Sequence, residues 1–175
     1  NKLDSDIHNF AFPSRYSSFI SLASALNCNK LKIQGSLLGT FINDKTDIGS
    51  ASEHTSALTP AIFITWTPFN DIPISLRAFA KKSFRMPTFN DLYYVDIGNA
   101  KLEPESAIQY NIGATFEKQN INRLFSSFKV QADAYYNTVD DKIVAYPKGT
   151  QCRWTMLNLG KVHIHGVDMT AETSI

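Results

Sequence analysis

Two histidines near the C-terminal end, His163 and His165, have the type and spacing of metal ligands. Residues two positions apart on a β-strand point to the same side, so both imidazoles are able to approach one ion. The same alternation places them with Val167 and Met169, on the outward apolar face of the strand. The sequence offers no third ligand beside them. We therefore expect two exposed histidines and no metal site.

Two pairs of carboxylates, Asp140 with Asp141 and Glu103 with Glu105, have the residue types of a general acid and a general base. Nothing in the sequence places either pair in a cleft, so the sequence does not predict an enzyme, and no motif indicates a cofactor. The 17 basic residues nearly balance the 16 acidic ones, for a net charge of +1. This balance gives no reason to expect nucleic acid as a partner.

A third candidate is a polar and aromatic stretch that follows a predicted strand. Its members offer hydrogen bonds and ring surfaces to an organic ligand. They are Arg85, Asn90, Asp91, Tyr93 and Tyr94. In a second interpretation, Pro87 fixes the exit of the chain from the strand and the aromatic rings only pack the loop against the rim. The choice depends on the elements that position this stretch.

Segments in which apolar and polar residues alternate recur along the chain, as is typical of antiparallel β proteins. In residues 107–117, one face carries apolar side chains and the other is mostly polar. The apolar face is Ile108, Tyr110, Ile112, Ala114 and Phe116; the opposite face is Gln109, Asn111, Gly113, Thr115 and Glu117. Similar segments occur near residues 20–26, 31–41, 57–67, 73–84, 128–136 and 157–173. The sequence thus predicts about seven strands.

The predicted connections alternate between short and long. Residues 27–30 and 68–73 are short turns, whereas residues 43–56, 85–106 and 146–156 are longer and irregular. Residues 118–126 are at the short-turn end but are long for a turn. Short turns at one end and long loops at the other are typical of bacterial outer-membrane barrels, whose long loops are extracellular.

No stretch approaches the roughly 20 apolar residues that a membrane helix needs, which excludes a helical membrane protein. A barrel strand needs only about 10 residues of alternating character, so a barrel remains possible. A soluble β-sandwich would also alternate, because each of its sheets packs one face on the core. The run of charged and amide side chains on the inner face favours a barrel with a wet lumen.

Several motifs of the chain occur together in the order found in one family. The first is Phe84-Arg85-Met86-Pro87, followed by Asn99-Ala100-Lys101-Leu102-Glu103-Pro104-Glu105; later come Tyr136-Asn137, Asp141-Lys142-Ile143, Asn158-Leu159-Gly160 and Gly166-Val167-Asp168. Over about residues 74–173 the chain resembles the late barrel of TonB-dependent outer-membrane receptors. Cobalamin receptors are the most similar subfamily, and receptors for ferric siderophores and haem share these motifs.

The resemblance implies a fold and a function. The fold is an all-β antiparallel meander that forms part of a transmembrane β-barrel, with about seven strands of a larger barrel. The function is import of a large, scarce nutrient (cobalamin, a ferric siderophore or haem) across the outer membrane of a Gram-negative bacterium, with energy supplied by TonB. The partners are then TonB, the nutrient and outer-membrane lipid. A soluble β-sandwich binding module and a passive porin are the alternatives.

Complete members of the family also have an N-terminal plug and a short box that binds TonB. No segment of residues 1–175 resembles either, so we expect a partial receptor barrel. In such a barrel Cys28 lies in a periplasmic turn and Cys152 in an extracellular loop, about 30 Å apart across the hydrocarbon layer. Because a disulfide needs Cα atoms within about 7 Å, we expect no bridge between them.

Overall fold

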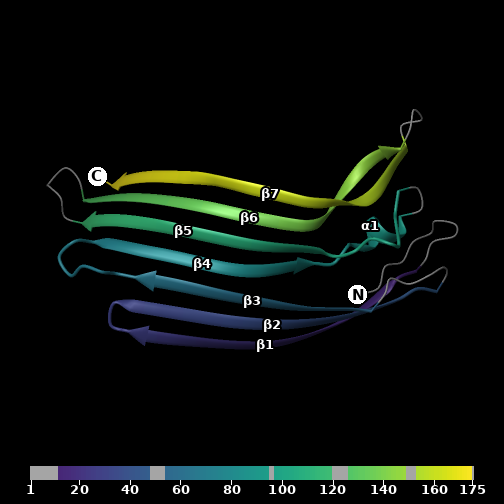
Figure 1. The fold of residues 1–175 in the computed structure, drawn as a ribbon, viewed down its shortest axis with the longest axis horizontal. Coiled ribbons are helices and arrows are strands. Elements are labelled where there is room, and N and C mark those ends of the chain that lie inside the picture. The colour runs from purple at the N-terminus through teal and green to yellow at the C-terminus, as the bar shows by residue number, and fades with distance from the viewer. Residues whose placement is uncertain (1–11, 48–53, 95–96, 120–125, 149–152, 175) are drawn as a thin grey trace.

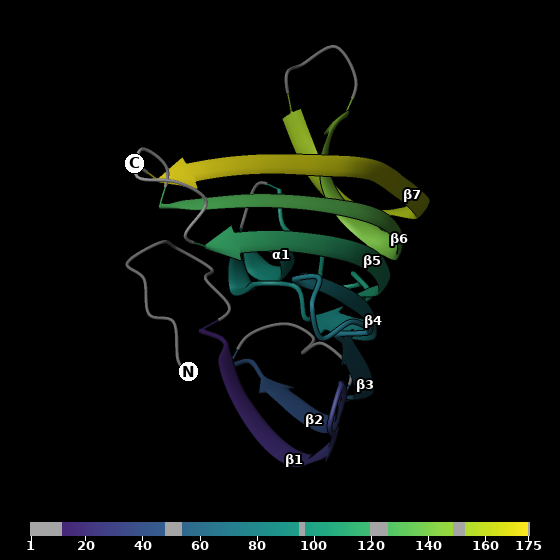
Figure 2. The same cartoon turned by 90° about the vertical axis from the view of Figure 1, so that its left-hand side faces the viewer.

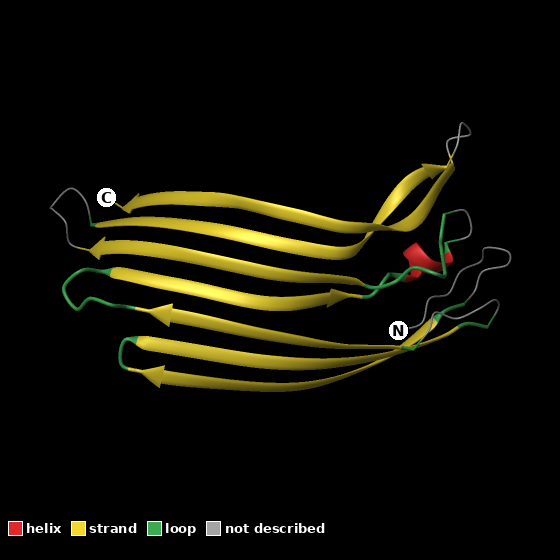
Figure 3. Ribbon diagram, in the orientation of Figure 1, coloured by secondary structure: helices red, strands yellow, loops and turns green. Residues whose placement is uncertain are grey.

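The computed structural model describes residues 12–47, 54–94, 97–119, 126–148 and 153–174. Within these ranges the chain forms one antiparallel sheet whose seven strands are neighbours in sequence order. The strands are β1 (Ser14–Cys28), β2 (Leu31–Lys45), β3 (Thr55–Trp66), β4 (Ile74–Arg85), β5 (Glu105–Gln119), β6 (Ser127–Lys148) and β7 (Arg153–Ser174); a short helix, α1 (Phe89–Tyr93), lies between β4 and β5. The predicted all-β meander is confirmed (Figures 1 and 3).

The register of the sheet aligns the apolar side chains of neighbouring strands. One cross-strand row takes one residue from each strand and is apolar throughout: Leu26, Ile33, Ile64, Ala78, Ile112, Ala134 and Val167. Because the side-chain period of a strand is two, a slip of one residue would replace the members of this row with residues of the other face. The register therefore gives the sheet one continuous apolar face.

The sheet is curved, and α1 lies on its concave side (Figure 2). The convex face carries large apolar side chains that remain exposed, with 69% exposure at Val167 and 75% at Met169. A soluble sandwich would cover such a face with a second sheet, and the described residues contain only the one sheet. Among the described residues, no helix combines the length and the apolar content required to cross a bilayer.

The two ends of the sheet differ in their connections. At one end β1 turns into β2 through only Asn29 and Lys30, and Asn29 adopts a positive φ of 45°, which asparagine tolerates better than most residues. At the other end, residues 86–104 join β4 to β5 and include α1. The short turn predicted near residues 27–30 and the longer connection predicted near residues 85–106 are thus both present, at opposite ends of the sheet.

The expected loop at residues 146–156 is wrong in its bounds. The β6 and β7 strands pair with each other as far as Lys148 and Arg153, well beyond Asp140, where the pairing of β6 with β5 ends. Proline has no backbone N–H to donate to a neighbouring strand. Pro147 is nevertheless compatible with this extension, because β5 no longer pairs with β6 at this position. The extended hairpin bends away from the rest of the sheet (Figure 1), and Asp141 in the same region has a φ of 56°.

Gly166 allows close packing on the concave face, because a Cβ atom there would lie 2.5 Å from the Tyr135 hydroxyl oxygen. We expect Gly166→Val to lower the free energy of unfolding by about 1–3 kcal/mol, the usual range for overpacking. The matched control is Gly160→Val on the same face of β7, where an added Cβ meets nothing within 4 Å. Urea unfolding of both variants in lipid vesicles measures the difference; equal losses would contradict the packing argument.

Candidate functional site

The segment between β4 and β5, residues 86–104, begins with a helix cap. The Thr88 hydroxyl accepts a hydrogen bond from the Asp91 backbone N–H at 3.2 Å, and the Asp91 carboxylate accepts one from the Thr88 backbone N–H at 2.9 Å. This reciprocal capping box satisfies two backbone donors at the start of α1. A helix of five residues is too short to form by propensity alone, so the cap and tertiary contacts must hold it.

We expect Thr88→Ala to destabilise α1 by about 1 kcal/mol, the usual cost of losing an N-cap side chain. The measurement is amide hydrogen exchange, which should become faster at Asp91 and Leu92 and remain unchanged in β5. Thr88→Ser keeps the hydroxyl and serves as the control. Equal exchange rates in the alanine and serine variants would show that the cap does not hold the helix.

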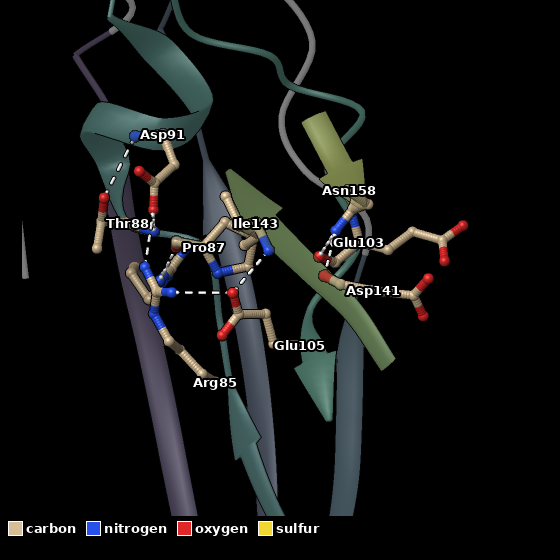
Figure 4. Close-up of polar contacts among 10 residues, drawn as sticks. Arg85, Pro87, Thr88, Asp91, Glu103, Glu105, Asp141, Ile143 and Asn158 are labelled. Atoms are coloured by element: carbon tan, nitrogen blue, oxygen red, sulfur yellow. Dashed lines mark hydrogen bonds and ion pairs between the residues drawn. The ribbon is translucent and has the colours of Figure 1, made fainter. Parts of the chain in front are cut away.

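Arg85, the last residue of β4, joins this cap to the next strand. Its guanidinium lies 3.4 Å from the Asp91 carboxylate and 3.1 Å from the Glu105 carboxylate. Glu105 also accepts a hydrogen bond of 2.6 Å from the backbone N–H of Ile143 in β6. Figure 4 shows Arg85 between the two carboxylates. One ion-pair group thus connects β4, α1, β5 and β6.

Asn158 of β7 anchors the other end of the segment. Its side-chain amide donates to the backbone oxygens of Glu103, at 2.9 Å, and Asp141, at 2.7 Å. Its side-chain oxygen accepts from the Glu103 N–H at 2.9 Å (Figure 4). A small apolar core lies beneath these bonds and consists of Leu92, Leu102 and Ile143, with Tyr93 and Met156 packed against it.

A second anchor ties the start of the segment to β1. Arg15 donates to the backbone oxygen of Pro87 at 2.9 Å, and its guanidinium lies 5.0 Å from the centre of the Phe89 ring. The same guanidinium makes a two-point contact with Asp44, with both distances at 2.7 Å. The Asp44 side chain is fully buried. The described parts of this segment are therefore held to β1 near Pro87 and to β7 near Glu103.

The structure divides the five predicted ligand residues into two groups. Asp91 is only 8% exposed and Tyr93 packs on the apolar core, so both hold the segment in place. Tyr94 is 45% exposed, and Asn90 and Arg85 also reach the surface. The structure thus agrees with the loop-packing interpretation at Asp91 and Tyr93, and ligand contact stays a prediction.

Sequence reasoning missed four residues that organise this rim. Glu105 and Asn158 stand inside motifs quoted for the family resemblance, so their positions were visible although their roles were not. Arg15 and Asp44 belong to no motif. Their pairing follows from the β1–β2 register, in which they are direct partners.

Residues 20–174 match the family model described as "TonB dependent receptor-like, beta-barrel". The match covers nearly the whole sheet. The chain belongs to the TonB-dependent receptors. The homology predicted from the motifs of residues 74–173 is confirmed and extends to the first three strands as well.

Two curated relatives of this TonB-dependent receptor chain are named vitamin B12 transporter BtuB. The protein from Vibrio vulnificus is 32% identical over 94 residues, which cover 53% of this chain and 14% of the relative. The protein from Photobacterium profundum is 30% identical over 98 residues, which cover 56% of this chain and 16% of the relative. The aligned part therefore represents a small fraction of each relative's length.

Solved structures of the family share the fold. The FrpB iron transporter from Neisseria meningitidis superposes with a TM-score of 0.66 at 18% identity, covering 91% of this chain and 23% of that protein. The Serratia marcescens hemophore receptor HasR, solved with its hemophore HasA and heme, gives 0.77 at 12% identity, covering 92% and 32%. The prediction that the meander forms part of a receptor barrel is confirmed.

The concave wall of the receptor sheet carries a second ion pair, between Arg77 of β4 and Asp133 of β6. The two groups meet across β5, where Gly113 has no side chain; a Cβ there would lie 2.2 Å from an Asp133 carboxylate oxygen. Arg77 also donates to the Thr115 hydroxyl at 3.1 Å, and Gln131 donates to Asp133 at 2.9 Å. Polar groups on the inner face thus satisfy one another, as expected for a lumen wall.

The structure also places the other candidate pairs. His163 and His165 are exposed on the convex face, as predicted, and the His163 Nδ1 lies 2.8 Å from the Tyr136 hydroxyl. In the described ranges, no group of three or more His, Cys, Asp or Glu side chains is arranged to hold a metal ion. Asp140 pairs with Lys161 at 3.2 Å.

The predicted absence of a disulfide remains untested. Cys28 is exposed and is the last residue of β1, at the short-turn end of the sheet. Cys152 lies outside the described residues.

Proposed function

We propose that this chain forms part of the barrel wall of an outer-membrane active transporter that imports a large, scarce nutrient with energy supplied by TonB. The observation that carries the proposal is the family match over residues 20–174. The sheet geometry supports it, because the polar face is concave and the apolar face is convex and exposed. In this proposal the apolar face contacts outer-membrane lipid, and the remaining strands, a plug and a TonB-binding box belong to the same longer protein.

Cobalamin is the nutrient that we propose first. Its support is that the two curated relatives, at 32% and 30% identity, are both named vitamin B12 transporters. Ferric siderophores and haem are the next candidates, since the structural neighbours include an iron transporter and a receptor solved with heme. All three are large metal chelates with polar rims, and the rim of this barrel offers hydrogen-bonding and aromatic groups to such a molecule.

The test uses the full-length gene in a bacterial host that lacks its own cobalamin receptor and needs cobalamin for growth. We expect growth at limiting cobalamin, and loss of that growth when the host's tonB gene is deleted. Uptake that persists without TonB would indicate a passive porin instead. A protein found in the soluble fraction would indicate a soluble binding module. Parallel cultures limited for iron, supplied with a ferric siderophore or haem, test the other two nutrients.

Within this function, we propose that Arg85, Asn90 and Tyr94 contact the nutrient while Asp91 and Tyr93 hold the segment in place. We expect Tyr94→Ala to weaken nutrient binding about tenfold, which corresponds to the loss of one aromatic contact of about 1.4 kcal/mol. Nutrient binding to the purified receptor is measured by isothermal titration. The control is Tyr146→Ala, an exposed tyrosine on the extended hairpin. Equal binding by the wild-type and Tyr94→Ala proteins would remove Tyr94 from the site.

A further inference from the structure

The sheet has an opening between β3 and β4 at the end of the longer connections. The two strands pair with each other only as far as Ala61 with Lys81. Both strands continue beyond this point, because β3 still pairs with β2 as far as Thr55 and β4 still pairs with β5 as far as Arg85. Within the described residues, no strand pairs with the two separated edges. These edges therefore hold backbone groups without a neighbouring strand.

Pro60 explains where the pairing stops. The Thr67 N–H donates to the Lys30 backbone oxygen at 2.8 Å, on the β2 side of β3. Backbone groups alternate between the two sides along an antiparallel strand, so those of Leu58 and Pro60 point toward β4. In the continued register Pro60 would pair with Lys82, but proline has no N–H to donate. The Lys82 backbone oxygen and the Leu58 N–H thus face the opening without strand partners.

A pocket of about 370 Å³ with mostly apolar walls lies at this opening. Its lining includes Phe19, Leu38, Ile42, Thr59, Phe84 and Met86. Phe19, Leu38 and Ile42 lie on the face opposite to the apolar row, which is the concave side, and the Phe19 side chain is 63% exposed there. Met86 follows directly after Arg85, one of the residues that we propose for nutrient contact. The pocket therefore adjoins the proposed nutrient site.

An amide group matches the polar part of this pocket. Its oxygen accepts a hydrogen bond and its N–H donates one, so an amide can pair with a strand edge as a neighbouring strand does. A carboxylate can only accept, so it has nothing to donate to the Lys82 backbone oxygen. Pockets for small molecules typically combine apolar walls with a few backbone groups that fix orientation. Among the nutrients considered above, cobalamin carries aliphatic amide side chains, whereas haem carries carboxylates.

We propose that the opening between β3 and β4 binds an aliphatic amide side chain of the nutrient. The amide oxygen accepts from the Leu58 N–H, the amide N–H donates to the Lys82 backbone oxygen, and the carbon chain packs on Phe19 and Ile42. Pro60 is a positioning residue, because it keeps the two edges from pairing with each other. The inference rests on the proposed function and deepens it by naming the chemical class of nutrient that the site accepts.

The test uses the full-length receptor purified from outer membranes in detergent, with cobalamin as the probe. Pro60→Val supplies the missing N–H, so the β3–β4 pairing should continue and close the pocket. Leu58→Pro removes the donor that faces the opening and leaves the β2 side of β3 unchanged. The matched control is Gly35→Val, which adds a valine on the convex face of β2, where a Cβ meets nothing within 4 Å. Binding is measured by isothermal titration.

We expect Pro60→Val and Leu58→Pro to bind cobalamin roughly tenfold more weakly, as for the loss of one hydrogen bond and its packing, and Gly35→Val to bind as the wild type does. Amide hydrogen exchange at Lys82 should become slower in Pro60→Val. Pro60→Val adds a backbone bond, so it tests the site even if Leu58→Pro fails to fold. Binding by Pro60→Val equal to that of the wild type would overturn the inference.

A set of cobalamin monocarboxylates, each with one amide hydrolysed, tests the chemical class. One of them should bind the wild type roughly tenfold more weakly than cobalamin, and this difference should disappear in Pro60→Val. The same difference in both proteins would place the amide contact elsewhere and overturn this inference alone, since such a receptor still binds and imports its nutrient. Absence of TonB-dependent uptake of any nutrient would instead overturn the proposed function.

Discussion

Ile112→Arg should strongly impair assembly of the barrel in the membrane. Ile112 is the central residue of β5, lies in the apolar row that crosses all seven strands, and is 65% exposed on the convex face. An arginine that faces lipid at the bilayer midplane costs about 2–4 kcal/mol. We expect the folded fraction, measured by heat-modifiable migration on gels after refolding into lipid vesicles, to fall sharply.

The neighbouring position provides the control for this prediction. Asn111 lies next to Ile112 on the same strand, and alternation points it to the concave side. Asn111→Arg introduces the same charge at nearly the same depth but into the wet lumen, so we expect the folded fraction to stay near that of the wild type. Equal loss in both variants would contradict the assignment of the convex face to lipid. The comparison does not depend on the nutrient.

Arg15→Met should destabilise the barrel by about 3–5 kcal/mol, because it leaves a buried carboxylate without its cation. The Asp44 side chain has 0% exposure and Arg15 has 14%, and they meet at two points of 2.7 Å. The variant also removes the bond from Arg15 to Pro87 that anchors residues 86–104. The free energy of unfolding is measured by urea titration in vesicles, with tryptophan fluorescence as the signal.

Two further variants test the cause of this loss. The double variant Arg15→Met with Asp44→Leu removes both charges, so much of the stability should return. Lys161→Met breaks an ion pair whose partners are 56% and 37% exposed, and we expect a loss below about 1 kcal/mol. If the double variant is no more stable than Arg15→Met, the cost does not come from the buried charge of Asp44.

Nutrient uptake should respond to these variants in different ways. Arg15→Met loosens the segment that carries Asn90 and Tyr94, so nutrient binding should weaken in the molecules that remain folded. Ile112→Arg acts only on the lipid side, so its folded molecules should bind as the wild type does. Binding measured per folded receptor separates the two effects.

The sequence by itself determined the strands and their faces. Alternation is a local property with a period of two, and residues 107–117 display it without reference to any neighbour. The seven predicted strands match the observed ones in number and order, and most of their bounds agree within about four residues; the largest differences are the start of β1, at Ser14 instead of residue 20, and the end of β6, at Lys148 instead of residue 136. Between β6 and β7 the sequence predicted an irregular connection over residues 146–156, whereas the structure continues the hairpin to Lys148 and Arg153, because these two strands pair with each other beyond the end of β5.

The tertiary structure alone decided how the rim is held together. Arg15 and Asp44 are 29 positions apart, Arg15 and Pro87 are 72 apart, and Glu103 and Asn158 are 55 apart. Such contacts depend on strand register and on the path of residues 86–104 across the concave side, and neither leaves a periodic signal in the sequence. Asp91 shows the result: its residue type suggested ligand binding, but its surroundings make it part of a helix cap. A residue's type limits which bonds it can make, and the long-range fold determines which of those bonds form.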